Sequence, residues 1–428
     1  MTTTPANSRA AAVRLLSRVL QKRQPLEEAL DPVLQGFPPR DRALARAITS
    51  TALRHLGVID ALIDKMLDRP LPEKALDVRH ILRIGITQIL YLNIPSHAAV
   101  HDTVALVPDR SKHKGLVNAL LRRIDRQGEK LLLKIDIPRR NTPPWLWDAW
   151  IAHYGEESAR RIAEAHLTEA ALDISVKSEP EKWAEALEAE ILPTGTLRRA
   201  TTATLVDLPG FEEGAWWVQD VAAALPAALL GNVAGKQIID LCAAPGGKTA
   251  QFAAAGAEVV ALDRSKNRLK RLEENMARLR LPVTVVVGEG ENFVPKRQPD
   301  GILLDAPCSS TGTLRRHPDV AYLKSQADVD KLSGLQARLL DHACEILGPG
   351  GLLVYSVCSL QPEEGERQIA ALLDRNPALK REPIKAEEVG GASELLNMDG
   401  DLRTLPFHLG GMDGFYAARL RKISTPSA

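Results

Sequence analysis

The sequence predicts a multidomain protein in which an all-helical domain precedes a small α+β subdomain and an α/β domain built on a doubly wound parallel sheet. The chain has 428 residues, enough for about three domains. Apolar residues recur at helical spacing up to about residue 134. From Gly235 onward, short aliphatic runs alternate with helical segments, which is the pattern of buried parallel strands joined by helices.

Composition excludes several other classes of protein. No window approaches the ~20 continuous apolar residues of a membrane helix, and residues 1–12 lack the apolar core of a signal peptide. The four cysteines (242, 308, 344 and 358) are too few for a disulfide scaffold and form no CxxC pair for zinc. We therefore expect a cytoplasmic protein with no membrane partner and no metal site.

Residues 1–135 are predicted to form the helical domain. One apolar helix face consists of Val78, Ile81, Leu82, Ile86 and Leu90. Up to residue 140 the chain holds 24 Lys and Arg against 14 Asp and Glu, a net charge of +10, whereas the remainder carries −9. This asymmetry favours a polyanionic partner for the front of the chain, most simply nucleic acid.

Residues 136–215 are predicted to contain a linker helix and the small α+β subdomain. The stretch 137–144 contains three prolines, which lack a backbone donor and disfavour helix continuation, so we interpret it as the linker. Helical patterns return from Trp145 to about Ala170. A strand at 173–177, a helix at 181–190 and a further short stretch at 203–207 follow.

Residues 216–428 are predicted to form the α/β domain. The helices expected between its strands include 265–279 and 329–346, and a last strand follows the glycine-rich loop 410–414. The expected strands are 237–241, 258–262, 283–287, 302–304, 352–356 and 415–420.

The loop after the first of these strands is the most informative stretch, with the sequence DLCAAPGGKT over 240–249. Gly246 and Gly247 let the backbone approach a ligand, and the helix that follows offers unpaired N–H groups. Phosphates and an adenosyl cofactor both fit such a loop. A phosphate-binding P-loop would need glycine where Cys242 stands, and the dinucleotide motif GxGxxG is absent.

Two carboxylates follow the next two strands. Asp263 ends the second strand, where an acidic residue suits the two hydroxyls of a ribose. Glu289 follows the third strand and could accept a hydrogen bond from an adenine amino group. For both residues the alternative is a carboxylate that only caps a helix.

Two cysteines and a third carboxylate stand at the ends of the fourth and fifth strands. Asp305 and Cys308 follow the fourth strand, and Cys358 follows the fifth. Because the carboxyl ends of parallel strands form the ligand crevice, we expect the three side chains to lie together beside the glycine loop. Cys344 in its helix and Cys242 in the loop are expected to pack against neighbours.

This set of side chains suits methylation of carbon 5 of a pyrimidine. That carbon is a poor nucleophile until a thiolate adds to carbon 6 and converts the ring to an enamine, which can attack a sulfonium methyl. An acid near ring nitrogen 3 stabilises the developing charge, and loss of the proton from carbon 5 then lets the thiol leave. The residues alone do not rank Cys358 above Cys308 as the nucleophile.

Three motifs resemble those of the RNA 5-methylcytosine methyltransferases of the Nop2/Sun (Fmu) family, nearly letter for letter. They are DLCAAPGGKT, LLDAPCSSTG (303–312) and VYSVCS (354–359), and WVQD (217–220) and DGFY (413–416) resemble the family's opening and closing motifs. The resemblance implies a Rossmann-like fold that uses S-adenosyl-L-methionine. The helical front resembles the RNA-binding fold of NusB, a pairing similar to the bacterial members that modify 16S ribosomal RNA.

The resemblance also implies a role for each motif residue. Cys358 is the implied nucleophile, Cys308 assists release of the product, and Asp305 lies at the cofactor and the target base. Glu289 departs from the family pattern, which usually has aspartate there. The implied cofactor site comprises Cys242, Ala243, Ala244, Pro245, Gly246, Gly247, Lys248, Asp263, Arg268, Glu289 and Asp305.

Basic residues indicate where RNA would bind. They crowd the last helical hairpin of the front domain and recur after the Cys308 loop, and a solvated surface is the alternative for any single one. The predicted RNA-binding residues are Arg110, Lys112, Lys114, Arg122, Arg123, Arg126, Arg315 and Arg316.

The expected function is therefore methyl transfer to carbon 5 of a cytosine in RNA, with 16S ribosomal RNA as the expected substrate, by a monomeric enzyme that does not act on DNA. Transfer RNA is the alternative substrate. A non-catalytic RNA-binding or antitermination adaptor is the alternative from another class, although Asp305, Cys308 and Cys358 are all present.

Overall fold

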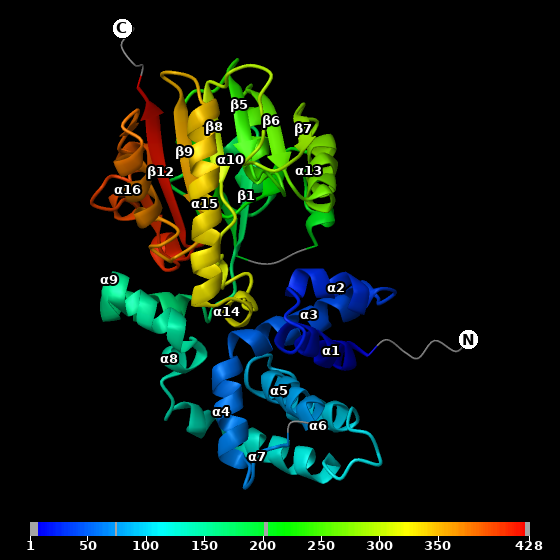
Figure 1. Cartoon of the computed structure of the whole chain (residues 1–428). Coiled ribbons are helices and arrows are strands. Elements are labelled where there is room, and N and C mark those ends of the chain that lie inside the picture. The colour runs from blue at the N-terminus through cyan, green and yellow to red at the C-terminus, as the bar shows by residue number, and fades with distance from the viewer. Residues whose placement is uncertain (1–6, 73–74, 201–203, 424–428) are drawn as a thin grey trace. The chain divides into compact units, whose positions relative to one another are not determined.

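The computed structural model describes residues 7–72, 75–200 and 204–423, and the chain divides into two compact units (Figure 1). The first unit holds the chain up to Thr168 together with Leu314–Ser325. The second unit holds Glu169–Thr313 and the chain from Gln326 onward. Within the described residues, no helix is both long and apolar enough to cross a membrane. The division into three domains, with boundaries after 135 and 215, stays a prediction.

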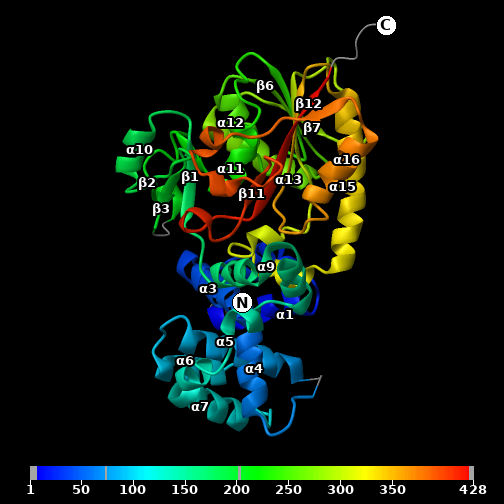
Figure 2. The same cartoon turned by 90° about the vertical axis from the view of Figure 1, so that its left-hand side faces the viewer.

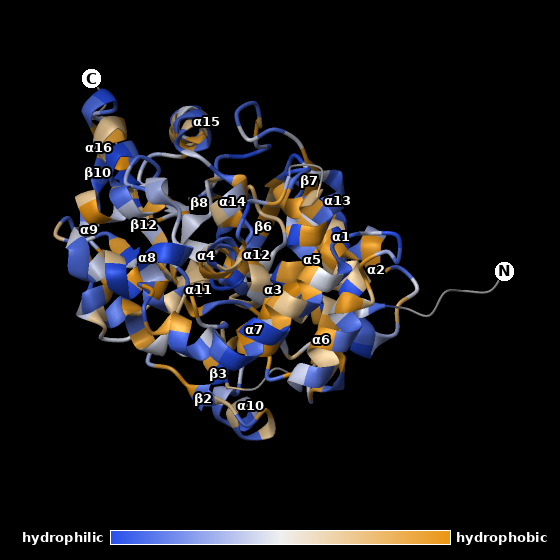
Figure 3. Cartoon of the chain, turned by 90° about the horizontal axis from the view of Figure 1, so that it is seen from below, coloured by the Kyte–Doolittle hydropathy of each residue, from blue (hydrophilic) through white to orange (hydrophobic). Residues whose placement is uncertain are grey.

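The first unit is all-helical, as predicted. Two of its apolar clusters are centred on α1–α3 and on α4–α7. The helix α7 is amphipathic in Figure 3, because Val117, Leu121 and Ile124 are buried while charged residues between them are exposed. The helices are α1 (Ser8–Leu20), α2 (Leu26–Leu34), α3 (Pro39–Arg54), α4 (Leu56–Met66), α5 (Leu76–Leu90), α6 (Ser96–Val104), α7 (Lys114–Leu132), α8 (Ile137–Asn141), α9 (Pro144–Ala165) and α14 (Val320–Leu323).

The expectation that three prolines disfavour a helix over 137–144 is wrong, because α8 lies within this stretch. Its role as a linker stays a prediction. Pro138 and Pro144 both stand in the first turn of a helix, where the N–H that proline lacks has no intrahelical acceptor to bond. Asp136 caps α8 by accepting a hydrogen bond from the Arg139 N–H. Asn141 at the end of α8 accepts from the Val58 N–H of α4 at 2.9 Å, which ties the short helix to the first unit.

A segment remote in sequence completes the first unit. The backbone N–H of Leu26 donates to the Asp319 carboxylate at 2.9 Å, and the Arg54 guanidinium donates to the carbonyl of Arg315 at 2.7 Å. Tyr322 and Leu323 pack against the apolar cluster of α1–α3. The chain therefore leaves the second unit directly after Thr313 and returns to it at Gln326.

The second unit contains a small four-stranded antiparallel sheet of order β2-β3-β1-β4 (Figure 2). The strands are β1 (Leu172–Val176), β2 (Glu190–Ile191), β3 (Leu197–Arg199) and β4 (Trp216–Val218), with α10 at Pro180–Ala186. In the predicted stretch 203–207, residue 203 lies outside the described residues and Leu205–Asp207 forms a 3-10 helix. The predicted α+β character of this region agrees with the structure.

The main sheet has eight strands in the order β10-β12-β9-β8-β5-β6-β7, with β11 paired to β12. Strands β5 to β9 are parallel, whereas β12 runs antiparallel to β9, so the predicted parallel sheet is in fact mixed. The strands are β5 (Gln237–Leu241), β6 (Glu258–Asp263), β7 (Thr284–Val287), β8 (Gly301–Asp305), β9 (Leu352–Val357), β10 (Leu379–Arg381), β11 (Leu402–Thr404) and β12 (Phe415–Lys422).

Helices cover both faces of this sheet, and alternate strand residues supply the two cores. Ile238, Leu303 and Val354 pack with α11 (Val221–Ala228) and α12 (Gly247–Ala254). Ile302, Leu304 and Tyr355 pack with α15 (Gln326–Ile346) and α16 (Glu366–Arg375). Strands buried on both faces explain why the sequence shows continuous aliphatic runs instead of alternation.

Replacing Gly57 tests the packing of α8 on α4. Gly57 is the second residue of α4, and a Cβ there would lie 1.9 Å from the carbonyl oxygen of Arg140, a backbone atom that cannot rotate away. Such overpacking typically costs about 1–3 kcal/mol, so Gly57→Ala should lower the urea midpoint of the full chain, followed by circular dichroism.

Gly115→Ala is the matched control, because Gly115 is the second residue of α7 and faces open space. Alanine favours a helix over glycine by up to ~1 kcal/mol, so the control should unfold at the same urea concentration or a higher one. Equal midpoints for the two variants would contradict the close contact of α8 with α4.

Candidate active site

The glycine loop joins β5 to α12 in a conformation that only certain residues tolerate. Cys242 has φ +64° and Gly246 has φ +102°. A Cβ at Gly246 would lie 2.8 Å from Cγ of Leu272, so glycine is required there both for its backbone angle and for the close approach of α13 (Lys266–Leu279). The Ala243 N–H donates to the carbonyl of Leu262, which holds the loop beside the end of β6.

The two predicted cofactor carboxylates lie next to this loop. Asp263 is 2% exposed and accepts hydrogen bonds from the N–H groups of Ser265 at 2.8 Å and Ala244 at 3.3 Å. Arg268 pairs with Asp263 at 3.4 Å and also donates to the carbonyl of Ala244. Glu289 is exposed just after β7. The cap of the following helix is Ser265, whose hydroxyl accepts from the Arg268 N–H at 3.4 Å, whereas Asp263 bonds the Ser265 N–H just before the helix. The role of Asp263 toward a ribose stays a prediction.

A cavity of about 380 Å³ opens beside the glycine loop. Gly246, Gly247 and Lys248 line it together with Asp305, whereas Asp263, Arg268 and Glu289 are not among its lining residues. Several further side chains line the cavity although the sequence analysis assigned them no role, among them Phe211, Trp217, Gln219, Asn275 and Arg278. Trp217 and Gln219 belong to the motif at 217–220, which was a signal for these two.

Lys248 and Asp305, which both line this cavity, form an ion pair. The Lys248 ammonium lies 2.7 Å from one Asp305 oxygen, and the Ser356 hydroxyl donates to the other at 2.8 Å. The Lys248 side chain is 9% exposed and also lies over the Phe415 ring, with the ammonium 5.1 Å from the ring centroid. Lys248 and Ser356 therefore fix the orientation of the Asp305 carboxylate, because each binds one of its two oxygens.

Cys308 and Cys358 lie together, as the strand ends predicted. Their sulfur atoms are 3.4 Å apart, and Ser310 Oγ lies 3.5 Å from the Cys358 sulfur. The hydrogen bond from Cys308 lowers the pKa of the Cys358 thiol, and the same contact together with burial raises the pKa of Cys308. The opposite directions of the two pKa shifts therefore favour a thiolate at Cys358 and a neutral thiol at Cys308.

The motif at 413–416 holds the Cys308 loop from the other side. The Gly414 N–H donates to the carbonyl of Gly312, and the Gly312 N–H donates to the carbonyl of Cys358 at 3.1 Å. A Cβ at Gly312 would lie 1.9 Å from the Gly414 oxygen, so the two backbones touch. Three motifs that are far apart in sequence thus meet around the two sulfurs.

The predicted RNA-binding residues have different surroundings. Arg110, Lys112, Arg122, Arg123 and Arg126 are exposed on or just before α7, and Lys114 is engaged by Asp109 at 2.5 Å. Arg315 and Arg316 belong to the segment that completes the first unit. Arg315 is 3% exposed and Arg316 is half-buried, and the role of both toward RNA stays a prediction.

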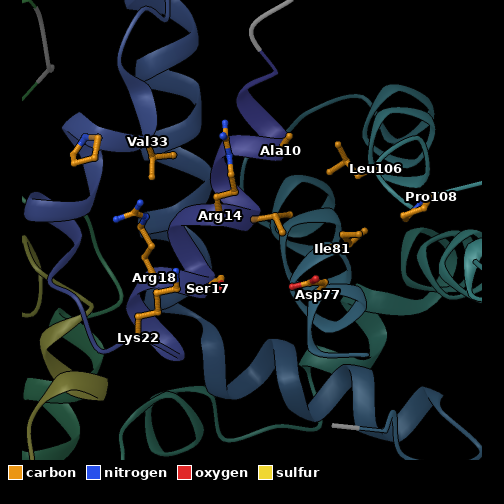
Figure 4. A pocket seen from close by; sticks show the side chains of 12 residues that line it. Ala10, Arg14, Ser17, Arg18, Lys22, Val33, Asp77, Ile81, Leu106 and Pro108 are labelled. Atoms are coloured by element: carbon orange, nitrogen blue, oxygen red, sulfur yellow. The ribbon is translucent and has the colours of Figure 1, made fainter. Parts of the chain in front are cut away.

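The first unit also contains a cavity of about 470 Å³ that the sequence did not predict (Figure 4). Arg14, Arg18 and Lys22, spaced four residues apart along α1 and just beyond it, lie on one side, and Ile81 and Leu106 lie on the other. The spacing of these three cations was visible in the sequence, but no motif distinguished them from an ordinary solvated helix face.

The fold and the glycine loop together define the class of the protein, an S-adenosylmethionine-dependent methyltransferase with a helical domain in front. The family model described as 16S rRNA methyltransferase RsmB/F matches residues 227–421, and the NusB family model matches residues 6–126. These matches confirm the predicted NusB-like and Rossmann-like folds.

Known proteins similar to the chain include ribosomal RNA small subunit methyltransferase B of Cronobacter sakazakii, which is 34% identical over 97% of this chain and 99% of that protein. The protein of the same name from Vibrio vulnificus is 36% identical over 97% and 99%. The crystal structure of a methyltransferase homologue from Pyrococcus horikoshii is 28% identical, with a TM-score of 0.55 over 64% of this chain and 94% of that one. The chain therefore belongs to the family of ribosomal RNA small subunit methyltransferases B.

The residues at the site fit S-adenosylmethionine as the cofactor. Gly246, Gly247 and Lys248 of the glycine loop line the cavity of about 380 Å³, and the buried Asp263 carboxylate accepts a hydrogen bond from the Ala244 N–H of the same loop. Lys248 and Asp305 stand where the loop meets the two sulfur-bearing strand ends. A cationic, adenosyl-bearing methyl donor is chemically suited to a loop bordered by carboxylates.

The pKa difference between the two thiols predicts which one reacts first. Because the thiolate is the reacting form, iodoacetamide should alkylate Cys358 before Cys308 at neutral pH. Cys308→Ala removes the hydrogen bond that lowers the Cys358 pKa, so the pH profile of Cys358 alkylation should move to higher pH. Peptide mass mapping measures the rate at each cysteine.

Cys344→Ala is the control for this experiment, since Cys344 is buried in α15 and should leave the profile of Cys358 unchanged. Faster alkylation of Cys308 than of Cys358 would reverse the assignment of the thiolate.

Proposed function

We propose that the enzyme methylates carbon 5 of a cytosine in 16S ribosomal RNA through a covalent bond between Cys358 and carbon 6. The observation that carries the proposal is the 3.4 Å distance between the Cys308 and Cys358 sulfurs beside the Lys248–Asp305 pair. We further propose that it acts on RNA and not DNA, as a monomer in the cytoplasm. Its four free cysteines fit a reducing compartment.

The proposed reaction begins with addition of the Cys358 thiolate to carbon 6, which moves electron density to carbon 5. When bound, the cofactor supplies a methyl group made electrophilic by its sulfonium. The Lys248 ammonium, held by Asp305, is proposed to lie near ring nitrogen 3 and balance the negative charge that develops there. After carbon 5 has taken the methyl group and the sulfonium has become a neutral thioether, carbon 5 loses its proton to a base, the sulfur–carbon 6 bond breaks, and Cys358 leaves as thiolate.

Cys308 is proposed to act in the last step. Its thiol is held within hydrogen-bond distance of the Cys358 sulfur and is kept neutral by burial and by Cys358 itself. A neutral thiol beside the departing sulfur can donate a hydrogen bond to the thiolate as it forms, which favours release. The two cysteines thus have separate roles: attack for Cys358 and release for Cys308.

Replacing each cysteine separates these roles. Cys358→Ala should abolish methylation of unmodified 16S RNA and form no covalent complex, because carbon 5 never becomes nucleophilic. Cys308→Ala should still form the adduct but release it slowly, so a protein–RNA complex should survive denaturing gel electrophoresis. Bisulfite mapping of the same RNA, with transfer RNA in a parallel reaction, identifies the substrate and the carbon.

Two results would contradict the proposal. A trapped complex with Cys358→Ala and none with Cys308→Ala would exchange the roles of the cysteines. Full methylation by both variants would exclude the covalent mechanism, and methylation confined to transfer RNA would exclude the proposed substrate.

We propose that the exposed basic face of α7 holds the RNA backbone. Each phosphate contact releases a counterion, so losing one should flatten the dependence of log K on log salt by about 0.7–0.9. The triple variant Arg122→Ala, Arg123→Ala, Arg126→Ala should therefore bind RNA more weakly and with a smaller salt slope. Filter binding over a salt series measures both quantities.

The matched control removes three exposed cations from the second unit: Lys270→Ala, Arg271→Ala, Lys331→Ala. It changes the net charge equally and should leave the salt slope closer to that of the unmodified chain. Equal losses of slope in the two variants would mean that general charge, and not the α7 face, determines the binding.

A further inference from the structure

We propose that Glu364 is a positioning residue for methyl transfer, whose buried carboxylate ties the loop bearing Cys308 to the loop bearing Cys358 and so sets the distance between the two sulfurs. The inference rests on the proposed role of the two cysteines. Glu364 follows β9 in the turn that leads into α16, and sequence analysis assigned it no role.

The carboxylate of Glu364 contacts both loops directly. One oxygen accepts from the Ser309 N–H at 2.8 Å, and the other accepts from the hydroxyls of Ser309 and Ser359. Ser309 and Ser359 are the residues immediately after Cys308 and Cys358. A single side chain is thus hydrogen-bonded to the neighbour of each reacting cysteine.

All the hydrogen-bonding capacity of this carboxylate is used. The Gln336 amide of α15 donates the fourth hydrogen bond, at 3.2 Å, and a carboxylate offers about four acceptor positions. Glu364 is 0% exposed, and a buried carboxylate with fewer donors would be costly. The set of four donors therefore fixes the side chain in one orientation.

The backbone of Glu364 is fixed as well. Its carbonyl accepts from the hydroxyl of Tyr355 at 2.6 Å, and Tyr355 is fully buried in β9. Its N–H donates to the carbonyl of Gln361 at 3.1 Å. The backbone of Glu364 is hydrogen-bonded to Tyr355 of β9, and its carboxylate is hydrogen-bonded to both cysteine loops. Glu364 therefore fixes the positions of both loops relative to β9.

The position of Glu364 also makes the two thiols unequal. Its negative charge is among the causes that raise the pKa of Cys308, and it is not among the causes that act on Cys358. A neutral Cys308 is the form that donates a hydrogen bond to Cys358. The carboxylate thus favours the arrangement of one donor and one thiolate that the proposed mechanism requires.

The first experiment measures sulfur separation without measuring catalysis. Diamide oxidises two neighbouring thiols to a disulfide, taking up two electrons and two protons, and thiols 3.4 Å apart should close rapidly. Glu364→Gln keeps the size of the side chain but replaces one acceptor oxygen with an N–H donor, so the loops should separate. We expect formation of the Cys308–Cys358 disulfide, mapped by mass spectrometry, to slow at least tenfold.

The second experiment measures the reaction of the full chain with 16S RNA. A misplacement of about 1 Å in reacting groups can cost ~10²-fold in rate, so kcat of Glu364→Gln should fall by about that factor. KM for RNA and Kd for S-adenosylmethionine should change less than twofold. The alkylation profile of Cys358 should move to higher pH, because the Cys308 donor is no longer held against it.

Asp401→Asn is the matched control, because Asp401 is a second buried carboxylate of the same unit, with 1% exposure, and bonds Tyr416 and Arg381 instead of the cysteine loops. It should cost stability without altering the disulfide rate or the alkylation profile. Ser359→Ala is the second variant if Glu364→Gln fails to fold, and it should slow disulfide closure in the same direction. It removes the link from Glu364 to the Cys358 side, together with the contacts of the Ser359 hydroxyl with Gln361, Thr311 and Ser309.

Wild-type disulfide rates in both Glu364→Gln and Ser359→Ala would overturn the proposal, as would an equal slowing in Asp401→Asn. Failure of the proposed function gives a different result: Cys358→Ala would still methylate RNA while the disulfide rate continued to depend on Glu364.

Discussion

The parallel pairing of β8 with β9 is the interaction on which the active site depends. Its register sets Asp305 opposite Ser356, so the loops that follow the two strands begin side by side. Cys308 and Cys358 are 50 positions apart in sequence, yet each lies only two or three residues beyond this paired end. Main-chain hydrogen bonds between two buried strands thus determine which side chains can reach one another.

The position of the glycine loop likewise depends on parallel strand pairing, here of β5 with its two neighbours. Strand β5 pairs with β8 on one side and with β6 on the other, which brings Lys248 to Asp305 and Ala244 to Asp263. Burial affects the protonation of a third carboxylate in this region, that of Asp240, which is fully buried. Desolvation raises the pKa of Asp240 to about 7, although the Thr249 hydroxyl donates a hydrogen bond to it at 2.6 Å. The polar groups at the carboxyl ends of these apolar strands are therefore held in place by hydrogen bonds and an ion pair with one another.

The sequence was sufficient to predict the strands of the parallel region to within a residue or two, because strands buried on both faces must be continuous aliphatic runs. It could not predict that β12 runs antiparallel to β9, since side-chain alternation is the same in either direction. The strands β10 and β11 were missed because each has only three residues and contains charged side chains. Short extended segments of this kind gain their structure from the neighbouring strand and not from their own composition.

The active-site residues at the ends of regular strands were predicted, whereas the one in an irregular turn was not. Strand ends indicated where Asp305, Cys308 and Cys358 would meet, whereas Glu364 stands in a turn with no periodic pattern, and nothing local distinguishes its carboxylate from a solvated one. What identifies it is a set of four donors from three separate segments, and that set exists only after folding. Positioning residues are in general harder to find from sequence than reacting ones, because their chemistry is ordinary and only their surroundings are special.

The basic residues illustrate the limit of charge as a guide. Arg122, Arg123 and Arg126 alternate with the buried Leu121 and Ile124 of α7, so helical phase alone assigns them to the surface. Arg315 follows Leu314 in a segment with no helical period, and there the apolar neighbours decide the outcome. Leu314, Pro318 and Ala321 are buried within the first unit, and Arg315 is buried beside them. The carbonyl of Arg315 accepts a hydrogen bond from the Arg54 guanidinium. A cluster of arginines predicts a polyanion site only where the pattern of apolar residues leaves those arginines outside.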